Sequence, residues 1–362
     1  MPKAKYADFV NPLRLWSETV RPSYRGKMAD FSLMFDEQVY PNAPLWVETF
    51  YAYAPGQGVA IPGSLPGFKF GKERKGPPTQ HSHDNFDELF LFFGTDPMDN
   101  TRLGGEVEMW LGNGANAEKY IAREPTAKWV PRGVAHNPWI VTKVNNPKYP
   151  IIIMVIALTH TYSTDESVTK TYPLPPAFSM DKLGIEQHGK GKYAKLFNKM
   201  NLSQTILIPQ LVGRVCTPNL MFDDTVYKAP VWVEIFHVYA GGCGAGVPSL
   251  WRTIGPDGKV QDNSKGMQHA QKYDELFMFI TSDPHDTLNL GGEVDIWLGD
   301  EKYSITKSSA AWVPAGTPHN PMYYKRVDPG RTYFMVVIAL VDNWKFFDGI
   351  TKSWTAPKAF KF

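Results

Sequence analysis

The chain has 362 residues, which is too long for one ordinary domain and suits two. Hydrophobic residues make up 43% and charged residues 20%, a balance that excludes wholesale disorder. The formal net charge of +2 comes from charges of both signs without long runs, so we expect neither a nucleic-acid nor a membrane partner. Two cysteines are too few for a disulfide framework, and the N-terminal residues lack the apolar core of a secretory signal. These features predict a cytoplasmic protein.

The predicted elements, taken in chain order, are short strands separated by turns. Runs rich in aromatic and β-branched residues occur at 45–53, 88–93, 106–111 and 151–158. Thirty glycines and thirty prolines, with asparagine and aspartate, interrupt these runs. No run keeps a 3.6-residue period over three turns, so we predict an all-β fold.

The chain contains an internal duplication. Residues Phe86–Gly112 align without gaps to Tyr273–Gly299, with 16 identities in 27 positions. Shorter matches lie upstream and downstream of this segment, and sequence identity at this level indicates two copies of one domain. We therefore predict four parts: an N-terminal arm (1–27), a metal-binding β domain (28–178), a connector (179–213) and a second β domain (214–362).

Four side chains of the first copy form a pattern typical of a metal site. His81 and His83 are two residues apart, so on a strand both imidazoles point to one face. A turn at Asp84 and Asn85 allows Glu88 to return on a neighbouring strand. His136 follows a second turn at 131–133. Three imidazoles and one carboxylate suit a divalent transition metal.

The arrangement HxH-x4-E followed by PxGxxH resembles the motifs of the cupin superfamily, and the duplication resembles a bicupin. The resemblance covers both copies. It implies two tandem cupin barrels of the jelly-roll or double-stranded β-helix type. It also implies that His81, His83, Glu88 and His136 hold one divalent transition metal per chain. Iron or manganese is our first expectation, with nickel, cobalt, copper and zinc as alternatives.

The second copy lacks part of this pattern. When it is aligned through Asp274 and Glu275, the positions of His81 and His83 fall on Gln268 and Ala270. His269 then lies one residue out of register, which would put its side chain on the opposite face of a strand. Glu275 and His319 remain. We predict a degenerate site that holds no tightly bound metal.

Residues Trp46, Glu48 and Phe50 alternate along one predicted strand and therefore share a face. A carboxylate between two large aromatic rings indicates an interior position, where burial would suit Glu48 to proton transfer. A structural ion pair is the alternative, and it is favoured because the second copy keeps a matching Glu234. Glu88 is the other candidate for a catalytic carboxylate.

Apolar side chains around the predicted ligands are candidates for a substrate pocket. Phe90 and Phe92 alternate with Glu88, and Ile140 alternates with His136, so we expect them to face the metal together with Trp46 and Phe50. Core packing without substrate contact is the alternative. By the same alternation Trp139 points away from the metal, unless a bulge interrupts its strand.

The first functional hypothesis is a metal-dependent dioxygenase that acts on an aromatic or enolisable small molecule, and the chain is similar to the flavonol-cleaving bicupin dioxygenases. The second is a non-oxidative decarboxylase, lyase or isomerase, in which the metal is a Lewis acid. The third is a ligand-binding bicupin without catalysis. The resemblance further implies that the chain forms a homo-oligomer. We expect its binding partner to be a small molecule.

Overall fold

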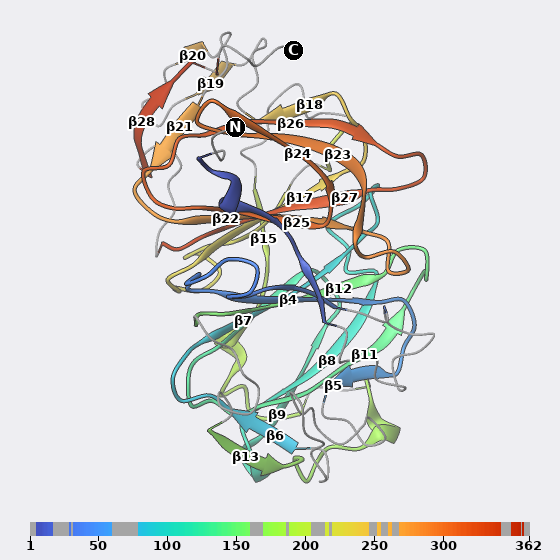
Figure 1. The fold of residues 1–362 in the computed structure, drawn as a ribbon. Coiled ribbons are helices and arrows are strands. Elements are labelled where there is room, and N and C mark those ends of the chain that lie inside the picture. Colours follow the sequence, from blue (N-terminus) through green and yellow to red (C-terminus); the bar gives the residue numbers. More distant parts are fainter. Residues whose placement is uncertain are drawn as a thin grey trace. The chain divides into compact units, whose positions relative to one another are not determined.

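The structure, a computed structural model, describes residues 5–16, 29, 32–59, 79–159, 169–185, 188–203, 214–216, 219–245, 252–254, 260–262, 268–341, 349–355 and 357. Residues 1–4 and 17–27 of the predicted arm, and 186–187 and 204–213 of the predicted connector, lie outside these ranges. The described residues form β-strands with four short 3₁₀ helices, η1 (Ala7–Phe9), η4 (Gly114–Asn116), η5 (Met180–Lys182) and η6 (Ala194–Leu196) (Figure 1). The prediction of an all-β fold is confirmed.

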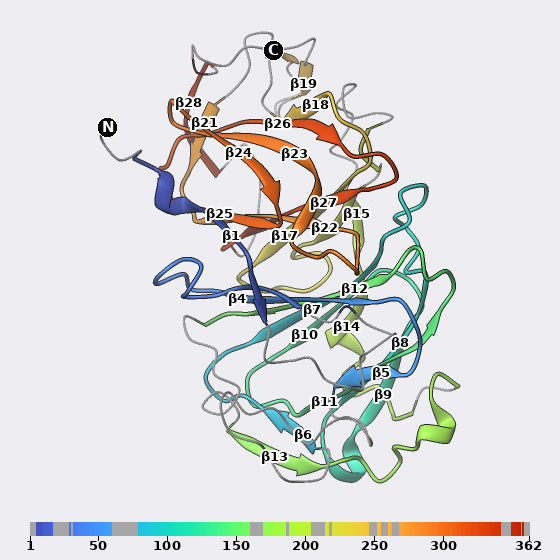
Figure 2. The ribbon, with the colours of Figure 1, turned by 45° about the vertical axis from the view of Figure 1, so that its right-hand side comes forward.

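The chain divides into two compact units. One, here the first barrel, comprises Arg14–Asp96 and Thr101–Met200. The other, the second barrel, comprises Met1–Leu13, Pro97–Asn100 and Asn201–Phe362. The described residues of each unit form a seven-stranded sheet and a six-stranded sheet, as expected from a duplication (Figures 1 and 2).

The first barrel has two antiparallel sheets. Its seven-stranded sheet has the order β14 (Phe197–Lys199), β10 (Thr126–Val130), β7 (Glu88–Gly94), β12 (Ile151–Ala157), β4 (Trp46–Ala52), β3 (Ser32–Phe35) and β2 (Arg14–Trp16). Its other sheet has the order β13 (Lys170–Pro173), β6 (Thr79–Ser82), β11 (His136–Val144), β8 (Gly105–Leu111) and β9 (Glu118–Ala122), with β5 (Gln57–Val59) also on β11. Side chains of β7 and β12 are buried along their whole length, so both strands lie in the core.

The second barrel repeats this plan. Its seven-stranded sheet has the order β1 (Val10–Pro12), β25 (Ser309–Val313), β22 (Glu275–Thr281), β27 (Tyr333–Ala339), β17 (Trp232–Val238), β16 (Asn219–Phe222) and β15 (Asn201–Ser203). Its other sheet has the order β24 (Glu301–Lys307), β23 (Asn289–Leu298), β26 (His319–Val327), β21 (Gln268–Gln271) and β28 (Ile350–Trp354), with β18 (Cys243–Ala245) on β26. A separate hairpin contains β19 (Arg252–Ile254) and β20 (Val260–Asp262).

The segment that precedes each repeat contributes one strand to each barrel. Strand β1 pairs with β25 in the second barrel, whereas the following β2 pairs with β3 in the first. Strand β14 pairs with β10 in the first barrel, whereas the following β15 pairs with β16 in the second. The segments that the sequence presents as an arm and a connector therefore each contribute strands to both barrels.

The segment after β13 packs against strand β9 of the first barrel through Glu118. The backbone amides of Lys190, Lys192 and Tyr193 all donate to the carboxylate of Glu118, and the Tyr120 hydroxyl donates to the same group. Burial acts to raise the pKa of Glu118, but these four hydrogen bonds lower it to about 2. One buried carboxylate thus fixes this part of the connector to the sheet.

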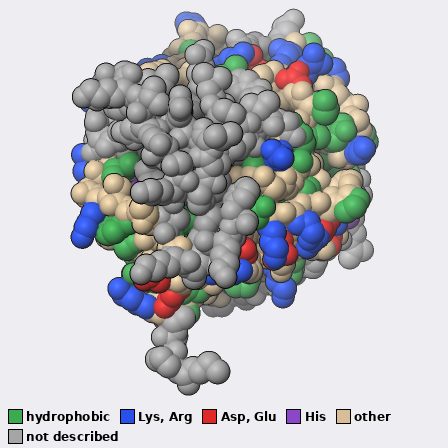
Figure 3. Space-filling view, turned by 90° about the horizontal axis from the view of Figure 1, so that it is seen from above, with side chains coloured by type: hydrophobic (Ala, Val, Ile, Leu, Met, Phe, Trp, Pro, Cys, Tyr) green, Lys and Arg blue, Asp and Glu red, His purple; other side chains and the backbone are tan. Residues whose placement is uncertain are grey.

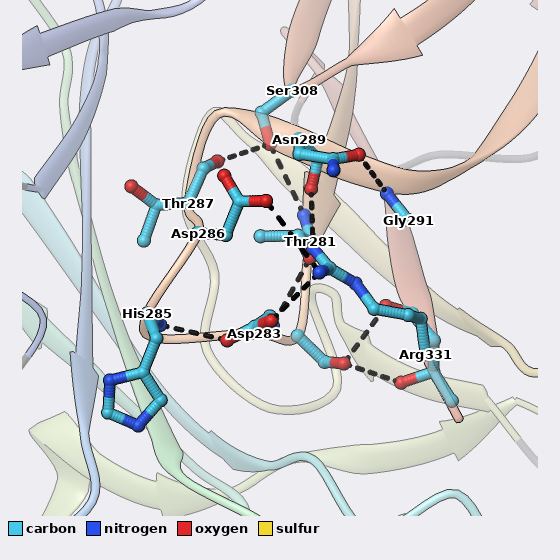
Figure 4. A network of polar contacts seen from close by, with 11 residues as sticks. Thr281, Asp283, His285, Asp286, Thr287, Asn289, Gly291, Ser308 and Arg331 are labelled. Atoms are coloured by element: carbon cyan, nitrogen blue, oxygen red, sulfur yellow. Dashed lines mark hydrogen bonds and ion pairs between the residues drawn. The ribbon is translucent and has the colours of Figure 1, made fainter. Parts of the chain in front are cut away.

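A polar network holds the loop that follows β22 in the second barrel. Figure 4 shows the Arg331 guanidinium pointing toward Asp283 and Asp286, and its Nη1 lies 3.0 Å and 3.7 Å from their carboxylate oxygens. The Arg331 Nη2 also donates to the Asn289 carbonyl at 3.1 Å. These contacts bring the loop against the strand that follows Arg331, which gives the cluster a structural role.

The surface carries charges of both signs. On the face in Figure 3, basic and acidic side chains of the described residues are interspersed, as the small net charge suggests. Among the described residues, no helix is long and apolar enough to cross a membrane.

We predict that Glu118→Gln destabilises the protein in a pH-dependent way. The folded-state pKa of Glu118 lies below its ordinary value of 4.5, so the carboxylate stabilises the fold above that pH. The contribution is lost as the pH falls toward 2. Urea unfolding at pH 7 should show a loss of about 2 kcal/mol, typical of hydrogen bonds to a buried charge.

The difference between wild type and variant should shrink when unfolding is measured at pH 3. Glu124→Gln is the control, because Glu124 is about half exposed and forms only a surface ion pair with Lys199. An equal loss of unfolding free energy at both pH values for Glu118→Gln would contradict a stabilising role of the ionised carboxylate.

Candidate metal centre

The four predicted ligands of the first copy meet inside the first barrel. His81 lies on β6 and is paired with His136, the first residue of β11. The ligand nitrogens of His81, His83 and His136 all lie within 4.8 Å of one another. Glu88, the first residue of β7, approaches them from the facing sheet, with Oε2 3.0 Å from His136 Nε2 and Oε1 3.6 Å from His83 Nε2. The sequence pattern thus becomes one compact cluster.

Local turns bring these residues together. The backbone N–H of Gly133 donates to the His83 carbonyl at 2.6 Å, and Gly133 has a φ of 78°, which a glycine adopts without strain. The Arg132 N–H donates to the Asp87 carboxylate at 2.7 Å. These bonds join the loop before His136 to the loop between His83 and Glu88.

Burial and charge put the ligands in metal-binding forms. Burial lowers the pKa of His81 and of His136, which favours neutral imidazoles. Burial acts to raise the pKa of Glu88, but the neighbouring His83 and His136 keep it well below its usual range. Neutral imidazoles and an ionised carboxylate are the forms that ligate metals.

A cation fits between Glu88 and His136. The His136 Nδ1 lies 3.1 Å from the Val134 carbonyl, to which it donates, so neutral His136 presents a lone pair on Nε2. That lone pair faces Glu88 Oε2 at 3.0 Å, and neither atom has a hydrogen-bond partner in the part of the chain that the structure describes. Two buried acceptors in this arrangement fit a shared metal ion. Asn137, which has a φ of 78°, places its amide nitrogen 3.3 Å from His81 Nδ1 and helps orient the third imidazole.

No family model matches this sequence, and no curated protein matches it either. Solved structures do match the fold. A tryptophan-to-tyrosine variant of oxalate decarboxylase from Bacillus subtilis superposes with a TM-score of 0.52, covering 96% of this chain and 79% of its own, at 9% identity. Oxalate decarboxylase from the same organism at pH 4.6 gives 0.51, with 96% and 78% coverage and 9% identity.

The chain has the bicupin fold. Two barrels with matching sheet orders, and a histidine cluster in the first, agree with the predicted tandem cupin architecture. At this level of identity the likeness concerns the fold.

The aromatic side chains predicted for the pocket, which come from β4 and β7, lie on one face of the seven-stranded sheet of the first barrel. Phe90 is paired with Val155, which is paired with Glu48, and directly paired residues point to the same face. Strand alternation adds Trp46 and Phe50 to this face beside Glu48, and Phe92 and Glu88 beside Phe90. The predicted shared faces are confirmed, and substrate contact by these residues stays a prediction.

The prediction for Ile140 is wrong in its geometry. A bulge between His136 and Trp139 shifts the register against β8, so Trp139 rather than Ile140 shares the face of His136. The Trp139 ring packs edge-on against Phe50, with centroids 5.5 Å apart. Ile140 is paired with Glu108 on the opposite face, so Trp139 takes the place in the pocket wall that alternation gave to Ile140.

Glu48 is buried and accepts a hydrogen bond from the Ser32 hydroxyl at 2.6 Å. In the second barrel, Asn219 donates to Glu234 at 2.9 Å in the same way. Both the proton-transfer role of Glu48 and its alternative, a structural ion pair, stay predictions.

The second barrel retains more of the site than the ungapped alignment indicated. His269 is paired with His319, as His81 is paired with His136, so the sequence register was wrong by one residue. The second copy has one residue fewer between this strand and Glu275, which is why the alignment shifted. The His319 Nε2 lies 3.1 Å from Glu275 Oε2.

One ligand position nevertheless differs. Gln271, whose amide contacts the Glu275 carboxylate, occupies the position of His83. The second cluster therefore has two imidazoles, a carboxylate and an amide, and an amide is a weaker ligand for transition metals than an imidazole. That this barrel holds no tightly bound metal stays a prediction.

Sequence reasoning also missed Lys128. Its side chain is fully buried, and it is paired with Phe90 on the face that carries Glu88. A lysine between alanine and tryptophan gives no signal in the sequence, because only the strand register places it beside the cluster.

We expect His83→Ala to lower the metal affinity of the first barrel by at least about tenfold, because it removes one of three converging imidazoles. Metal content by mass spectrometry after dialysis, with circular dichroism to verify the fold, measures this. His285→Ala, on an exposed loop, should keep the wild-type metal content. Unchanged metal content in His83→Ala would contradict the assignment.

We expect one tightly bound ion per wild-type chain and two in Gln271→His, because that change supplies the missing imidazole of the second cluster. His269→Ala should leave the tightly bound ion in place. Two tightly bound ions in the wild-type chain would show that the second barrel binds a metal ion with Gln271 in place of a histidine.

Proposed function

We propose that the chain is a metal-dependent bicupin enzyme that cleaves a small organic acid without net oxidation, as a decarboxylase or lyase. The observation that carries the proposal is the buried cluster of three imidazoles and one carboxylate in the first barrel. The structural likeness to oxalate decarboxylases favours this reaction class over oxygenation.

The proposed cofactor is one divalent transition metal per chain, held by His81, His83, Glu88 and His136. Manganese and iron are the first candidates. When bound, the metal supplies Lewis acidity that stabilises negative charge developing on substrate oxygens.

The surrounding residues have separate tasks in this proposal. Phe90, Phe92 and Trp139 exclude water from the reacting atoms, which strengthens electrostatic interactions there. Trp46 and Phe50 extend the same apolar wall. Glu48 lies on the face that carries Glu88 and is the group proposed to move the proton that replaces the lost carboxylate.

A dioxygenase acting on an aromatic or enolisable substrate is the second candidate. The observation that favours it is the number of aromatic side chains on the wall of the cluster, because such a wall would stack on an aromatic substrate and keep reactive intermediates from water. A ligand-binding bicupin without catalysis is the third.

The proposal includes the setting in which the enzyme works. We propose a small-molecule substrate, no nucleic-acid or membrane partner, a homo-oligomer and a cytoplasmic location. Both cysteines, Cys216 and Cys243, are buried and are not joined in a disulfide, which suits a reducing compartment.

Anaerobic turnover separates the two reactions. A panel of small carboxylic acids, incubated with manganese-loaded protein without O₂, should release CO₂ from its substrate at the aerobic rate, because decarboxylation consumes no oxidant. His83→Ala should lose this activity. Turnover that requires O₂ and consumes it in proportion to product would instead establish the dioxygenase.

A further inference from the structure

Lys128 is a charged residue type in an apolar interior. It lies on β10 of the first barrel, and its side chain has an exposed fraction of 0%. Its Nζ lies 4.0 Å from the centroid of the Phe90 ring, and it has no hydrogen-bond partner among the described residues. A buried amine without a partner costs stability, so its presence in a well-packed barrel calls for a ligand that completes it.

The Lys128 amine is close to the metal cluster, and its side chain lies on the sheet face that carries Glu88. Lys128 is paired with Phe90, and two residues further along the strand Val130 is paired with Glu88, so Lys128 and Glu88 share a face. The Phe90 ring is near both the amine and the cluster, with its centroid 4.0 Å from Lys128 Nζ and 6.0 Å from the centroid of the His136 ring. A small molecule bound to the cluster over Phe90 would therefore reach the amine.

The charge balance of the site indicates which small molecules fit. A divalent ion with neutral imidazoles and the ionised Glu88 leaves one net positive charge in a buried place. Burial lowers the pKa of Lys128, and the Glu88 carboxylate opposes that effect. A monoanion balances the site when the lysine is neutral, and a dianion balances it when the lysine is protonated. An uncharged ligand leaves charge uncompensated in either case.

We propose that Lys128 binds an anionic oxygen of the substrate, so that the first barrel takes small organic anions held between the metal and this amine. The proposal rests on the proposed function, because it names the substrate class of the same site.

The second barrel supplies an internal comparison. Ala311 is paired with Phe277 as Lys128 is paired with Phe90, and the Phe277 ring lies 5.7 Å from the ring of His319. The aromatic ring is thus retained next to the histidine, but the amine is replaced by a methyl group. The buried lysine is therefore present in the barrel whose cluster has three imidazoles and a carboxylate, and absent from the corresponding position of the other barrel.

Ligand binding by isothermal titration tests the role without turnover. The probes are acetate and its uncharged isostere acetamide, titrated into manganese-loaded full-length protein. Lys128→Met should weaken acetate binding about tenfold or more, as expected for a lost charge-assisted hydrogen bond, and change acetamide binding less than about twofold. Lys128→Arg, which keeps a cation, should retain more of the acetate affinity than Lys128→Met.

Lys195→Met is the matched control, because Lys195 is exposed on the same barrel and its loss removes the same charge. It should bind acetate as the wild type does. Equal acetate affinity in Lys128→Met and wild type would overturn the proposal. Loss of manganese in Lys128→Met would also overturn it, because the lysine would then act on the metal site and not on the substrate.

A structure of the unmodified protein answers the question if Lys128→Met does not fold. In manganese-loaded crystals soaked with acetate, a carboxylate oxygen within about 3.2 Å of Nζ is expected. Acetate bound elsewhere, or no bound acetate, would overturn the proposal. Because these measurements need no substrate turnover, a wrong reaction class would leave their outcome unchanged.

Discussion

The site depends on the contact between Glu88 and His136, two acceptors that face each other across the interior of the first barrel at 3.0 Å. The Val134 carbonyl fixes the imidazole so that its lone pair points inward, and β7 brings the carboxylate from the facing sheet. A cation between them would give both atoms a partner. The two sheets and the loops that join them therefore bring together side chains that suit a divalent metal ion.

The sequence predicted what depends on local spacing. His81 and His83 share a face because strands alternate, and Glu88 returns after a short turn, so these ligands follow from the chain itself. The sequence did not predict the register between strands that are far apart along the chain. A bulge after His136 reversed the positions of Trp139 and Ile140, and only strand pairing placed Lys128 beside the cluster.

The two barrels show which parts of the plan belong to the fold and which to the site. Both keep the paired histidines, the strand-leading glutamate and the phenylalanine beside them. A missing residue before Glu275 misled the alignment, although the backbone pairing of His269 is retained. Two of the differences lie at the cluster: His83 is replaced by Gln271, and Lys128 by Ala311. The first change replaces an imidazole with an amide and the second removes an amine, while the sheets persist.

The proposed function gives separate tasks to three ionisable side chains on the wall, Glu48, Glu88 and Lys128. A carboxylate that binds the metal has its oxygens engaged there, which makes Glu88 a poor donor of a proton to the substrate. Glu48, two strands away on the same face and hydrogen-bonded to Ser32, is not constrained in this way. Both barrels retain a glutamate at that position, Glu48 in the first and Glu234 in the second. In the proposed arrangement Glu88 would hold the metal, Lys128 would orient an anionic substrate, and Glu48 would move the proton.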